Sequence, residues 1–580
     1  MKHRTSLHIL CIFLINLLLS GNLQAQVGSK QTVSTGIKPM GIPIFLSGNF
    51  GEPRANHFHS GIDIKTGGVP GVPVRSVAPG YVSRIKVEPG GYGQALYLNH
   101  PNGYTSVYAH LQSFNKNIAE FVKHEQYRRE SFSVDLFPES SRFPVEAGQV
   151  IASSGNSGSS QGPHLHFEIR DTHSENPINP LIQALRVLDH TAPVMERIVI
   201  YSLGRHKEWI KPLDLNLTKG SSGVYTTRNS QPLPLDHRSG IGIQLYELID
   251  GSANRCGVYQ LQGYLDDELF FESLMDEFSF AETRYMNSYM DYRIYQIEGR
   301  YVLKLFVEPN NRSSIYHFTK NNGILVVRDS SVHELKIVAL DVAGNQSVAR
   351  CQVRLNPSDF KKDPDYLPTY NAFFSFAESN HFSADGLEID LPRGALYDDL
   401  YFKYLIEPTP DGCYSPLHRV HKNTTPLHQF FTLRIRPEKI PEPLKSKAQI
   451  VELDSDGRFS AVGGRWEGEM LTVRVRSFGD YTVMLDTIPP LIRAANFSLE
   501  EDLQNLETIR FIISDDLSGI HRYRGELDGK WILMEYDQKN RLLKYTWDAT
   551  RVDPRKTHRL TIQVDDQAGN SLSTSYQFYR

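Results

Sequence analysis

Short alternating segments separated by turn residues are the feature that most restricts the fold of this chain. Between residues 40 and 188 apolar and polar side chains alternate in runs such as "VPVRSVAPGYVSRIKV", "QALYLNH" and "TSVYAHL". A period of two, interrupted by Gly and Pro, is typical of β-strands. No helical period is apparent before "NPLIQALRVL" (179–188), and we expect the polar stretch 121–143 to be a loop insertion. The pattern predicts one β-rich domain over residues 40–188.

A repeat organises much of the remaining chain. "DHRSGIGI" resembles "DDLSGIHR", and "LDVAGNQS" resembles "VDDQAGNS". Each copy starts with a Pro-containing segment, and its Ala-Gly-Asn turn follows an alternating strand. Two copies of an Ig-like β-sandwich, over residues 189–356 and 487–580, are the simplest explanation, and the first copy contains an insertion.

The segment between the two copies, residues 357–486, also alternates and ends its runs in turns. Its segments "LPRGALYDDL" and "SFGDYTVMLD" resemble the small β-sandwich domains of the ZU5 kind. A chain of 580 residues is too long for one core. We therefore predict a mainly β protein, in which an N-terminal β-sheet domain is followed by about three β-sandwich domains.

One turn in the last copy, "DDLSG" (515–519), offers oxygen atoms of the kind that calcium binds. A turn rich in Asp, Ser and Gly also forms without an ion, which is the simpler interpretation.

The first residues are typical of a secretory signal peptide. Lys2 and Arg4 precede an apolar run from Leu7 to Leu19, and the small residue Ala25 closes the segment. We expect residues 1–25 to be removed, leaving an exported chain without a membrane span, in the periplasm or at the cell exterior. The net charge of -4 and the lack of a Lys/Arg-rich block argue against a nucleic-acid partner.

Removal of the leader would leave three cysteines, Cys256, Cys351 and Cys413. An odd and sparse set of this kind is no disulfide framework. Two interpretations stay open, a Cys256–Cys351 disulfide with Cys413 free, or three isolated buried thiols.

The segment "GPHLHFEIR" (162–170) carries two histidines one residue apart. In a strand, His164, His166 and Glu168 share one face, and the apolar residues between them share the other. A histidine pair on a solvated strand face needs no metal, so a metal site requires further ligands from elsewhere.

Those ligands are available in "HFHSGIDI" (57–64). Gly61 argues against a helix, so His59 and Asp63 are expected on one face of an extended segment. Two His and one Asp are a ligand set for catalytic zinc, which keeps its fourth position for water. "SVYAHL" adds His110 at the end of another strand, where it would by itself be interpreted as a structural histidine.

Together these segments resemble the M23 family of zinc metallopeptidases, the lysostaphin and LytM type. The family pattern is His-x-x-x-Asp, a Gly/Pro-rich strand segment, a Tyr-x-His-Leu-like strand and His-x-His. It is matched by "HSGID", "GVPVRSVAPGYVSRI", "YAHL" and "GPHLHFE". The resemblance covers about residues 40–183 and implies an antiparallel β-sheet peptidase domain.

The resemblance implies a role for each of five side chains. His59, Asp63 and His166 would bind Zn²⁺, whereas His110 and His164 would be unligated catalytic histidines. Which of these two is the base stays open.

Two further side chains near the motifs have uncertain roles. His57 forms a second His-x-His pair with His59, but only His59 is followed by Gly and by Asp at the matching distance. His57 is therefore interpreted as a groove wall or an exposed residue. Glu168 would orient a histidine or simply face solvent.

The resemblance also implies a function, a zinc metalloendopeptidase that hydrolyses peptide bonds in the stems or cross-bridges of bacterial peptidoglycan. The alternative is a non-catalytic adaptor that binds the cell wall and activates another hydrolase. Because such adaptors usually lack metal ligands and all five positions are filled here, the enzyme is favoured. The C-terminal β domains are expected to position the enzyme or to bind a protein or cell-wall partner.

Overall fold

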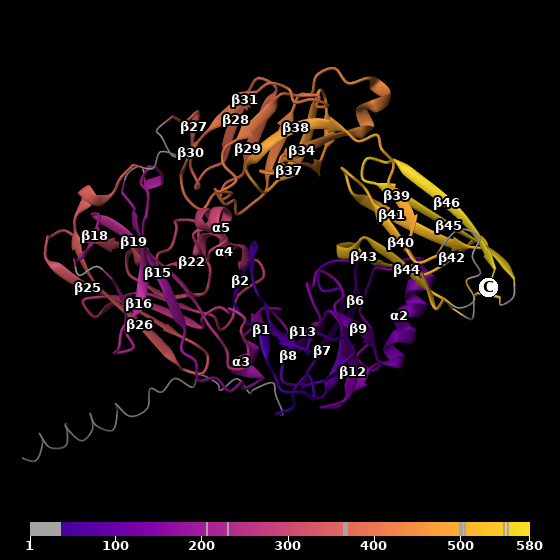
Figure 1. The fold of residues 1–580 in the computed structure, drawn as a ribbon, viewed down its shortest axis with the longest axis horizontal. Coiled ribbons are helices and arrows are strands. Elements are labelled where there is room, and N and C mark those ends of the chain that lie inside the picture. Colours follow the sequence, from indigo (N-terminus) through magenta and orange to yellow (C-terminus); the bar gives the residue numbers. More distant parts are fainter. Residues whose placement is uncertain are drawn as a thin grey trace, which may run out of the picture.

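The computed structural model describes residues 36–204, 207–228, 231–362, 369–497, 503, 506–548, 551–553 and 556–579. The leader predicted at residues 1–25 lies outside these ranges. The described chain consists mainly of β-strands, as predicted. Figure 1 shows four β-rich units that follow one another around a ring. We call residues 36–188 the first unit, 189–356 the second, 369–486 the third and 487–579 the fourth.

The first unit is built on a nine-stranded antiparallel sheet with the order β1-β4-β13-β8-β7-β6-β10, to which β11 and β14 add at the sides. A second sheet has the order β5-β12-β9. The strands of the first unit are β1 Leu46–Gly48, β2 Pro53–Arg54, β3 His57–Phe58, β4 Ile62–Lys65, β5 Pro73–Arg75, β6 Gly80–Val87, β7 Gln94–Asn99, β8 Tyr104–Ala109, β9 Leu111–Phe114, β10 Val134–Leu136, β11 Pro144–Val145, β12 Val150–Ser154, β13 His164–Asp171 and β14 Pro177–Ile178.

Helices in the first unit differ from the sequence prediction. The stretch 121–143, expected to be a loop, contains most of helix α2 (Lys116–Arg129) and strand β10. Helix α2 buries Ile118, Val122 and Gln126, which are four residues apart, and Asn115 caps its start by accepting from the amide of Ile118. This narrow buried face explains why the polar sequence concealed a helix. In 179–188 the only helix is the four-residue α3 (Pro180–Gln183).

The second unit has twelve strands in the order β22-β19-β15-β16-β17-β26-β25-β20-β21-β23, with β18 and β24 at the sides. They are β15 Val194–Ser202, β16 Leu213–Lys219, β17 Tyr225–Thr227, β18 Leu233–Leu235, β19 Arg238–Tyr246, β20 Gln260–Leu265, β21 Glu268–Leu274, β22 Val302–Lys304, β23 Tyr316–Thr319, β24 Leu325–Val326, β25 Val332–Leu340 and β26 Gln346–Leu355. The insertion predicted in this copy, around residues 266–292, contains helix α4 Met286–Tyr289, and helix α5 Tyr292–Glu298 begins at its end.

The third and fourth units each contain two facing sets of strands. The third has the orders β28-β29-β33-β37-β36 and β31-β32-β38-β34-β35, and a separate pair β27-β30. Its strands are β27 Ala372–Phe374, β28 Asn380–Ala384, β29 Leu387–Leu391, β30 Leu400–Phe402, β31 Tyr404–Glu407, β32 Leu417–Val420, β33 Phe431–Ile435, β34 Ala448–Leu453, β35 Phe459–Gly463, β36 Arg465–Glu467, β37 Met470–Val475 and β38 Gly479–Leu485.

The fourth unit has the sheet orders β39-β40-β44-β43 and β42-β41-β45-β46. Its strands are β39 Leu491–Ala494, β40 Thr508–Ser514, β41 Ile520–Leu527, β42 Lys530–Trp531, β43 Glu535–Asp537, β44 Leu542–Thr546, β45 Thr557–Asp566 and β46 Ser571–Tyr579.

The structure corrects one part of the sequence repeat. The two Ala-Gly-Asn turns are equivalent, because each joins a hairpin, β25–β26 in one unit and β45–β46 in the other. "DHRSGIGI", however, leads into β19, whereas "DDLSG" follows β40. Both strands pair with the first strand of their unit, so β19 corresponds to β40. The segment equivalent to "DDLSG" is therefore "ELIDG" (247–251), after β19.

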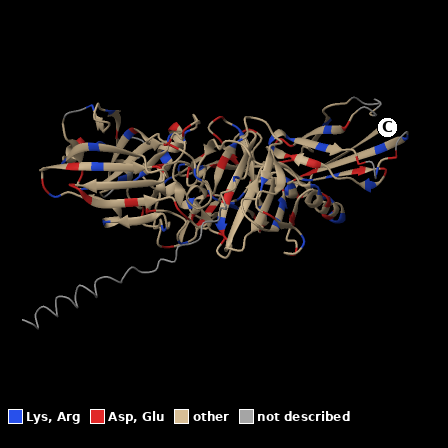
Figure 2. Ribbon diagram, turned by 90° about the horizontal axis from the view of Figure 1, so that it is seen from below, with Lys and Arg blue, Asp and Glu red and all other residues tan. Residues whose placement is uncertain are grey.

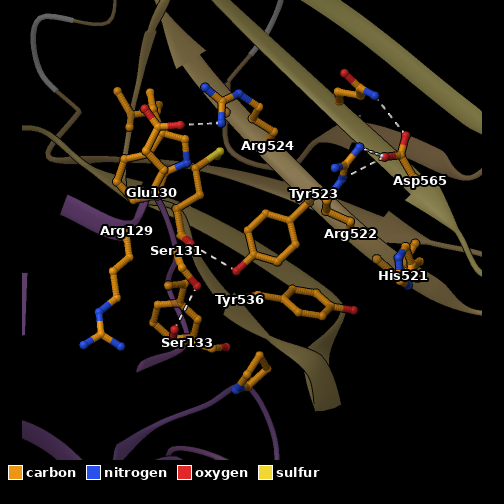
Figure 3. Close-up of a pocket in the computed structure, with 18 of the residues that line it drawn as sticks. Arg129, Glu130, Ser131, Ser133, His521, Arg522, Tyr523, Arg524, Tyr536 and Asp565 are labelled. Atoms are coloured by element: carbon orange, nitrogen blue, oxygen red, sulfur yellow. Dashed lines mark hydrogen bonds and ion pairs between the residues drawn. The ribbon is translucent and has the colours of Figure 1, made fainter. Parts of the chain in front are cut away.

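The fourth unit returns to the first and closes the ring (Figure 1). Tyr127 of α2 packs edge-on against Trp531, with 5.1 Å between ring centroids, and Lys123 forms an ion pair with Asp548. Figure 3 shows Glu130, just after α2, facing Arg524, and their side chains are 2.7 Å apart. Figure 2 shows acidic and basic residues interspersed over all the units. The closing contacts thus combine an aromatic pair with local charge pairs.

The cores of the first and second units interlock. Phe50 and Phe58 belong to the first unit by sequence, but both pack in the core of the second. Their rings lie 4.9 and 5.5 Å from Phe278, measured between centroids. The loop that contains Phe50 and Phe58 is therefore held by the neighbouring unit.

The three cysteines of the described chain are free thiols. Cys256 and Cys351 are buried in two different cores, so the interpretation as a Cys256–Cys351 disulfide is wrong. Cys413 is only half-buried. Among the described residues, none of the helices combines the length and the apolar character that a membrane span requires.

Replacement of Phe278 tests the interlocked core. Because Phe278 is buried against both Phe50 and Phe58, we expect Phe278→Ala to lower the free energy of unfolding by about 3–5 kcal/mol. Urea denaturation of the full chain measures the change. The matched control Phe318→Ala removes a ring that is 43% exposed and should change the value by less than about 0.5 kcal/mol. Equal effects of the two substitutions would contradict the interlocked arrangement.

Candidate metal centre

Three neighbouring strands bring the sequence-predicted site residues together. Strands β4, β13 and β8 lie side by side, and Asp63 of β4 is directly opposite His166 of β13. His59 lies shortly before β4, and His110 directly follows Ala109, which is opposite His166 on the other side. All five predicted positions therefore lie around one point of the sheet.

Gly61 permits this close approach. A Cβ atom at residue 61 would lie 2.4 Å from the carbonyl oxygen of Phe167, so a larger side chain would push the start of β4 away from β13. Close packing against β13 thus requires a glycine in "HSGID", and this packing keeps His59 next to the strand that carries His166.

Three buried side chains form a compact candidate ligand set. His59 Nε2 lies 3.1 Å from Asp63 Oδ1 and 3.1 Å from His166 Nδ1. His166 Nδ1 in turn lies 2.9 Å from Asp63 Oδ1. Two imidazole nitrogens and one carboxylate oxygen thus converge within a few ångströms of a common centre.

The other nitrogen of each ligand ring has a hydrogen-bond acceptor. His59 Nδ1 lies 2.8 Å from the carbonyl oxygen of Asn49, and because a carbonyl only accepts, Nδ1 donates. His166 Nε2 donates to Glu168 Oε1 over 2.8 Å. His59 Nε2 and His166 Nδ1 both face Asp63 Oδ1, and each can offer a lone pair to a cation once it carries no proton. Burial alone would lower the pKa of His166, but Asp63 and Glu168 outweigh it and raise the pKa to about 9.

Glu168 is the centre of a buried network behind the ligands. Its side chain is 0% exposed, and its Oε2 accepts from Arg170 Nε over 2.6 Å. Tyr92 and Ser60 also donate to Oε1, over 2.5 and 2.6 Å. Burial by itself would raise the pKa of Glu168, but Arg170 and His166 outweigh it and lower the pKa, so the carboxylate is ionised. The solvent-facing interpretation of Glu168 is wrong.

The two remaining histidines, His110 and His164, lie beside the ligand set with their rings 4.8 Å apart. Each has Nδ1 next to a backbone carbonyl, at 2.9 Å from Ser157 O for His110 and 2.8 Å from Gly162 O for His164. Both Nδ1 atoms therefore donate, and in the neutral form of each ring this leaves Nε2 as the acceptor. Burial, together with the neighbouring His166 and His164, lowers the pKa of His110 to about 3, so this ring is neutral.

Other residues at the site were missed or left open by the sequence. Arg54 Nη2 lies 3.0 Å from Asp63 Oδ2 and holds the oxygen that faces away from the histidines. Nothing in the local pattern around Arg54 indicates this contact. The position of His57 agrees with its interpretation as a groove wall. His57 is exposed, its Nδ1 bonds to Ala55 O, and it lines the cavity described next.

An open cavity of about 1200 Å³ lies over the five residues. The loop 159–163 of the first unit forms one wall, and Asn254, Phe280 and Thr283 of the second unit form another. Lys539 of the fourth unit donates to the carbonyl oxygen of Ser160 over 2.8 Å and so fixes the first of these walls. Three of the four units thus determine the shape of the groove.

Comparisons with known proteins agree with the sequence resemblance. The family described as Peptidase family M23 matches residues 57–127 and 140–180, and a Zu5-like domain matches residues 371–486. Both resemblances named from the sequence are thereby confirmed for these segments.

Individual relatives match about a fifth of the chain. The DD-carboxypeptidase/endopeptidase Mpg of Neisseria meningitidis serogroup B is 34% identical over 127 residues, 22% of this chain and 23% of that protein. Mpg of Neisseria gonorrhoeae gives the same values. An uncharacterized metalloprotease of Haemophilus influenzae is 32% identical over 123 residues, 21% of this chain and 20% of that protein. The chain thus spans less than a quarter of the length of these relatives.

Solved structures similar to part of the chain include two peptidase domains. The catalytic domain of the antimicrobial peptidase lysostaphin from Staphylococcus simulans is 24% identical, covers 24% of this chain and 90% of its own, and has a TM-score of 0.17. A catalytic domain of the prophage-encoded M23 protein EnpA from Enterococcus faecalis is 22% identical, covers 24% of this chain and 91% of its own, and has a TM-score of 0.18.

Substitution of Glu168 tests its role behind the ligands. Glu168→Gln keeps the shape but removes the charge that holds the proton on His166 Nε2, so we expect zinc affinity to fall about tenfold to a hundredfold. Competition with a chromophoric chelator measures the affinity. Glu139→Gln, which changes an exposed carboxylate of the same unit, should leave it unaltered. An unchanged affinity in Glu168→Gln would show that the network does not support the ligand.

Proposed function

We propose that the first unit is a zinc metalloendopeptidase that hydrolyses peptide bonds in the stems or cross-bridges of bacterial peptidoglycan. The observation that carries the proposal is the convergence of His59 Nε2, Asp63 Oδ1 and His166 Nδ1 beside two histidines whose Nδ1 atoms bond to backbone carbonyls. The match to peptidase family M23 supports the reaction class. The substrate follows from the family resemblance.

The ligand set fits zinc in composition and protonation. Two imidazole nitrogens and one carboxylate are common in catalytic zinc sites, and a fourth position remains open for solvent or substrate. Each ligand nitrogen can supply a lone pair once zinc displaces its proton, because the other nitrogen of each ring bonds to Asn49 or Glu168. When bound, zinc supplies Lewis acidity, which polarises a scissile carbonyl and lowers the pKa of water towards about 7.

The two other histidines are suited to proton transfer. His164 and His110 each hold their Nδ1 proton on a backbone carbonyl, so each presents Nε2 as a proton acceptor at the groove. One ring accepts the proton of the attacking water and returns it to the leaving amine. The second ring accepts a hydrogen bond from the attacking water and so orients it. The carbonyls of Ser157 and Gly162 keep both rings from rotating.

The remaining units are proposed to serve the same reaction. The leader pattern favours export to the periplasm or the cell exterior, where peptidoglycan lies. The second unit contributes Phe280 and Thr283 to the groove, and the fourth fixes the loop at Ser160. These units would therefore position substrate, and their outer faces would be available to a protein or cell-wall partner.

Single substitutions separate the ligands from the proton-transfer residues. We expect His166→Ala or Asp63→Ala to abolish both bound zinc and activity, because each removes one of three ligands. His164→Ala and His110→Ala should retain zinc but lose about 10²- to 10⁴-fold in rate, because each removes a proton-transfer group. Metal content and the release of new amino termini from isolated sacculi provide the two measurements.

His57→Ala is the matched control for these variants, since His57 lines the same cavity without bonding to a ligand. It should retain zinc and most of the activity. If zinc-loaded wild-type protein leaves sacculi intact but stimulates another hydrolase, the chain is an adaptor and the enzymatic proposal is wrong.

A further inference from the structure

Three acidic side chains meet at the joint between the first and second units. Asp189 directly follows the first unit, Glu247 follows β19 and Asp341 follows β25. One carboxylate oxygen from each lies within 4.8 Å of the other two. All three line a cavity of about 490 Å³, and none of them lines the groove over His59.

Glu247 has an oxygen without a partner. Its side chain is 1% exposed, and Oε1 accepts from the amide of Leu248 over 2.7 Å. Oε2 is buried and has no hydrogen-bond partner in the described part of the chain. Such an atom is costly to bury, and here its neighbours are two further carboxylates.

The cluster has no ion-pair partner in the described part of the chain, although Arg186 lines the same cavity. Among the described residues, no Lys, Arg or His forms an ion pair with Asp189, Glu247 or Asp341, although such pairs are common elsewhere on this chain. Burial and the charges of Asp341 and Asp189 raise the pKa of Glu247 to about 8. A cation between the three groups would supply the charge that the chain lacks.

The carboxylates are held in place by the chain. The backbone amide of Asn345 donates to Asp341 Oδ1 over 2.8 Å, and its side-chain amide donates to Asp341 Oδ2 over 2.7 Å. The same Asn345 amide group donates to the carbonyl oxygen of Asp189 over 3.0 Å. The cluster is therefore preorganised, which lowers the cost of binding an ion.

The fourth unit repeats this arrangement at equivalent positions. Asp486, Asp515 and Asp566 form a second acidic group with ligand atoms within 4.8 Å. Asn570 donates to Asp566 and to the carbonyl oxygen of Asp486, as Asn345 does to Asp341 and Asp189. The framework thus occurs twice, each time where a new unit begins. Asp515 Oδ1, at the position equivalent to Glu247, is likewise buried without a hydrogen-bond partner among the described residues. Glu247 is the more deeply buried of the two residues, so its cluster is better shielded from water.

We propose that Asp189, Glu247 and Asp341 bind a calcium ion that stabilises the joint between the first and second units. Three carboxylates without nitrogen or sulfur ligands suit a hard cation, and calcium accepts irregular oxygen shells that water completes. In exported modules such sites have dissociation constants of about 10⁻⁴–10⁻³ M. The proposal concerns the joint alone and is independent of the peptidase reaction.

Hydrogen–deuterium exchange of the zinc-loaded full chain tests this site locally. Addition of CaCl₂, from micromolar to about 10 mM, should slow exchange in peptides that contain residues 246–250 and 340–345. In Glu247→Gln, which keeps the acceptor for Leu248 but removes one of three charges, half-maximal protection should need at least about tenfold more calcium. Asp341→Asn provides a second, independent variant with the same expected loss.

Asp515→Asn is the matched control, because it alters the equivalent position in the fourth unit. It should leave the calcium response of residues 246–250 unchanged. Protection that is absent in the wild type, or equal in the wild type and in both joint variants, would overturn the proposal. Protection by magnesium at the same concentrations as by calcium would overturn the choice of calcium.

Discussion

The antiparallel register of β4 against β13 is the constraint on which the proposed chemistry depends. Because side chains alternate along a strand, a shift by one residue would turn His166 to the opposite face of the sheet and away from Asp63. Gly61 secures this register, since any Cβ there would collide with the backbone of Phe167. The buried Glu168 then fixes the tautomer of His166 from the same face of β13. The positions of Asp63 and His166 thus follow from one strand pairing, and Glu168 orients the His166 ring.

Much of the first unit could be predicted from the sequence, and the omissions have physical causes. A period of two placed His164, His166 and Glu168 on one face, and the strand pairing then brought His59 and Asp63 to them. Helix α2 was missed because it buries only a narrow face within a polar sequence. Contacts such as Arg54 with Asp63 leave no local pattern, because they depend on how distant segments pack. The repeat was recognised, but "DHRSGIGI" was matched with "DDLSGIHR" although the two segments are not equivalent. Their sequences are similar, but one leads into β19 and the other follows β40.

The first and second units share core contacts, so they are not two independently packed domains. The loop between Phe50 and Phe58 packs in the second unit, and the amide of Phe58 donates to Thr283 Oγ1 over 2.8 Å. Gly51, at φ 75°, lies so close to Met275 that a Cβ atom would be 2.7 Å from its side chain. His59 follows this loop directly. The position of one proposed zinc ligand therefore depends on a neighbouring core that lies outside the family match.

Asn49 connects the joint to the ligand set through a short chain of contacts. Its side-chain amide exchanges two hydrogen bonds with the backbone of Gly257, over 2.6 and 2.9 Å, while its carbonyl oxygen accepts from His59 Nδ1. Gly257 follows Cys256, whose backbone pairs with that of Glu247. The backbone pair of Glu247 and Cys256 has a single arrangement, so it can hold the neighbouring segment in place but is no two-state switch. A calcium ion at Glu247 would thus stabilise the segment around Gly257, to which the Asn49 side chain is hydrogen-bonded.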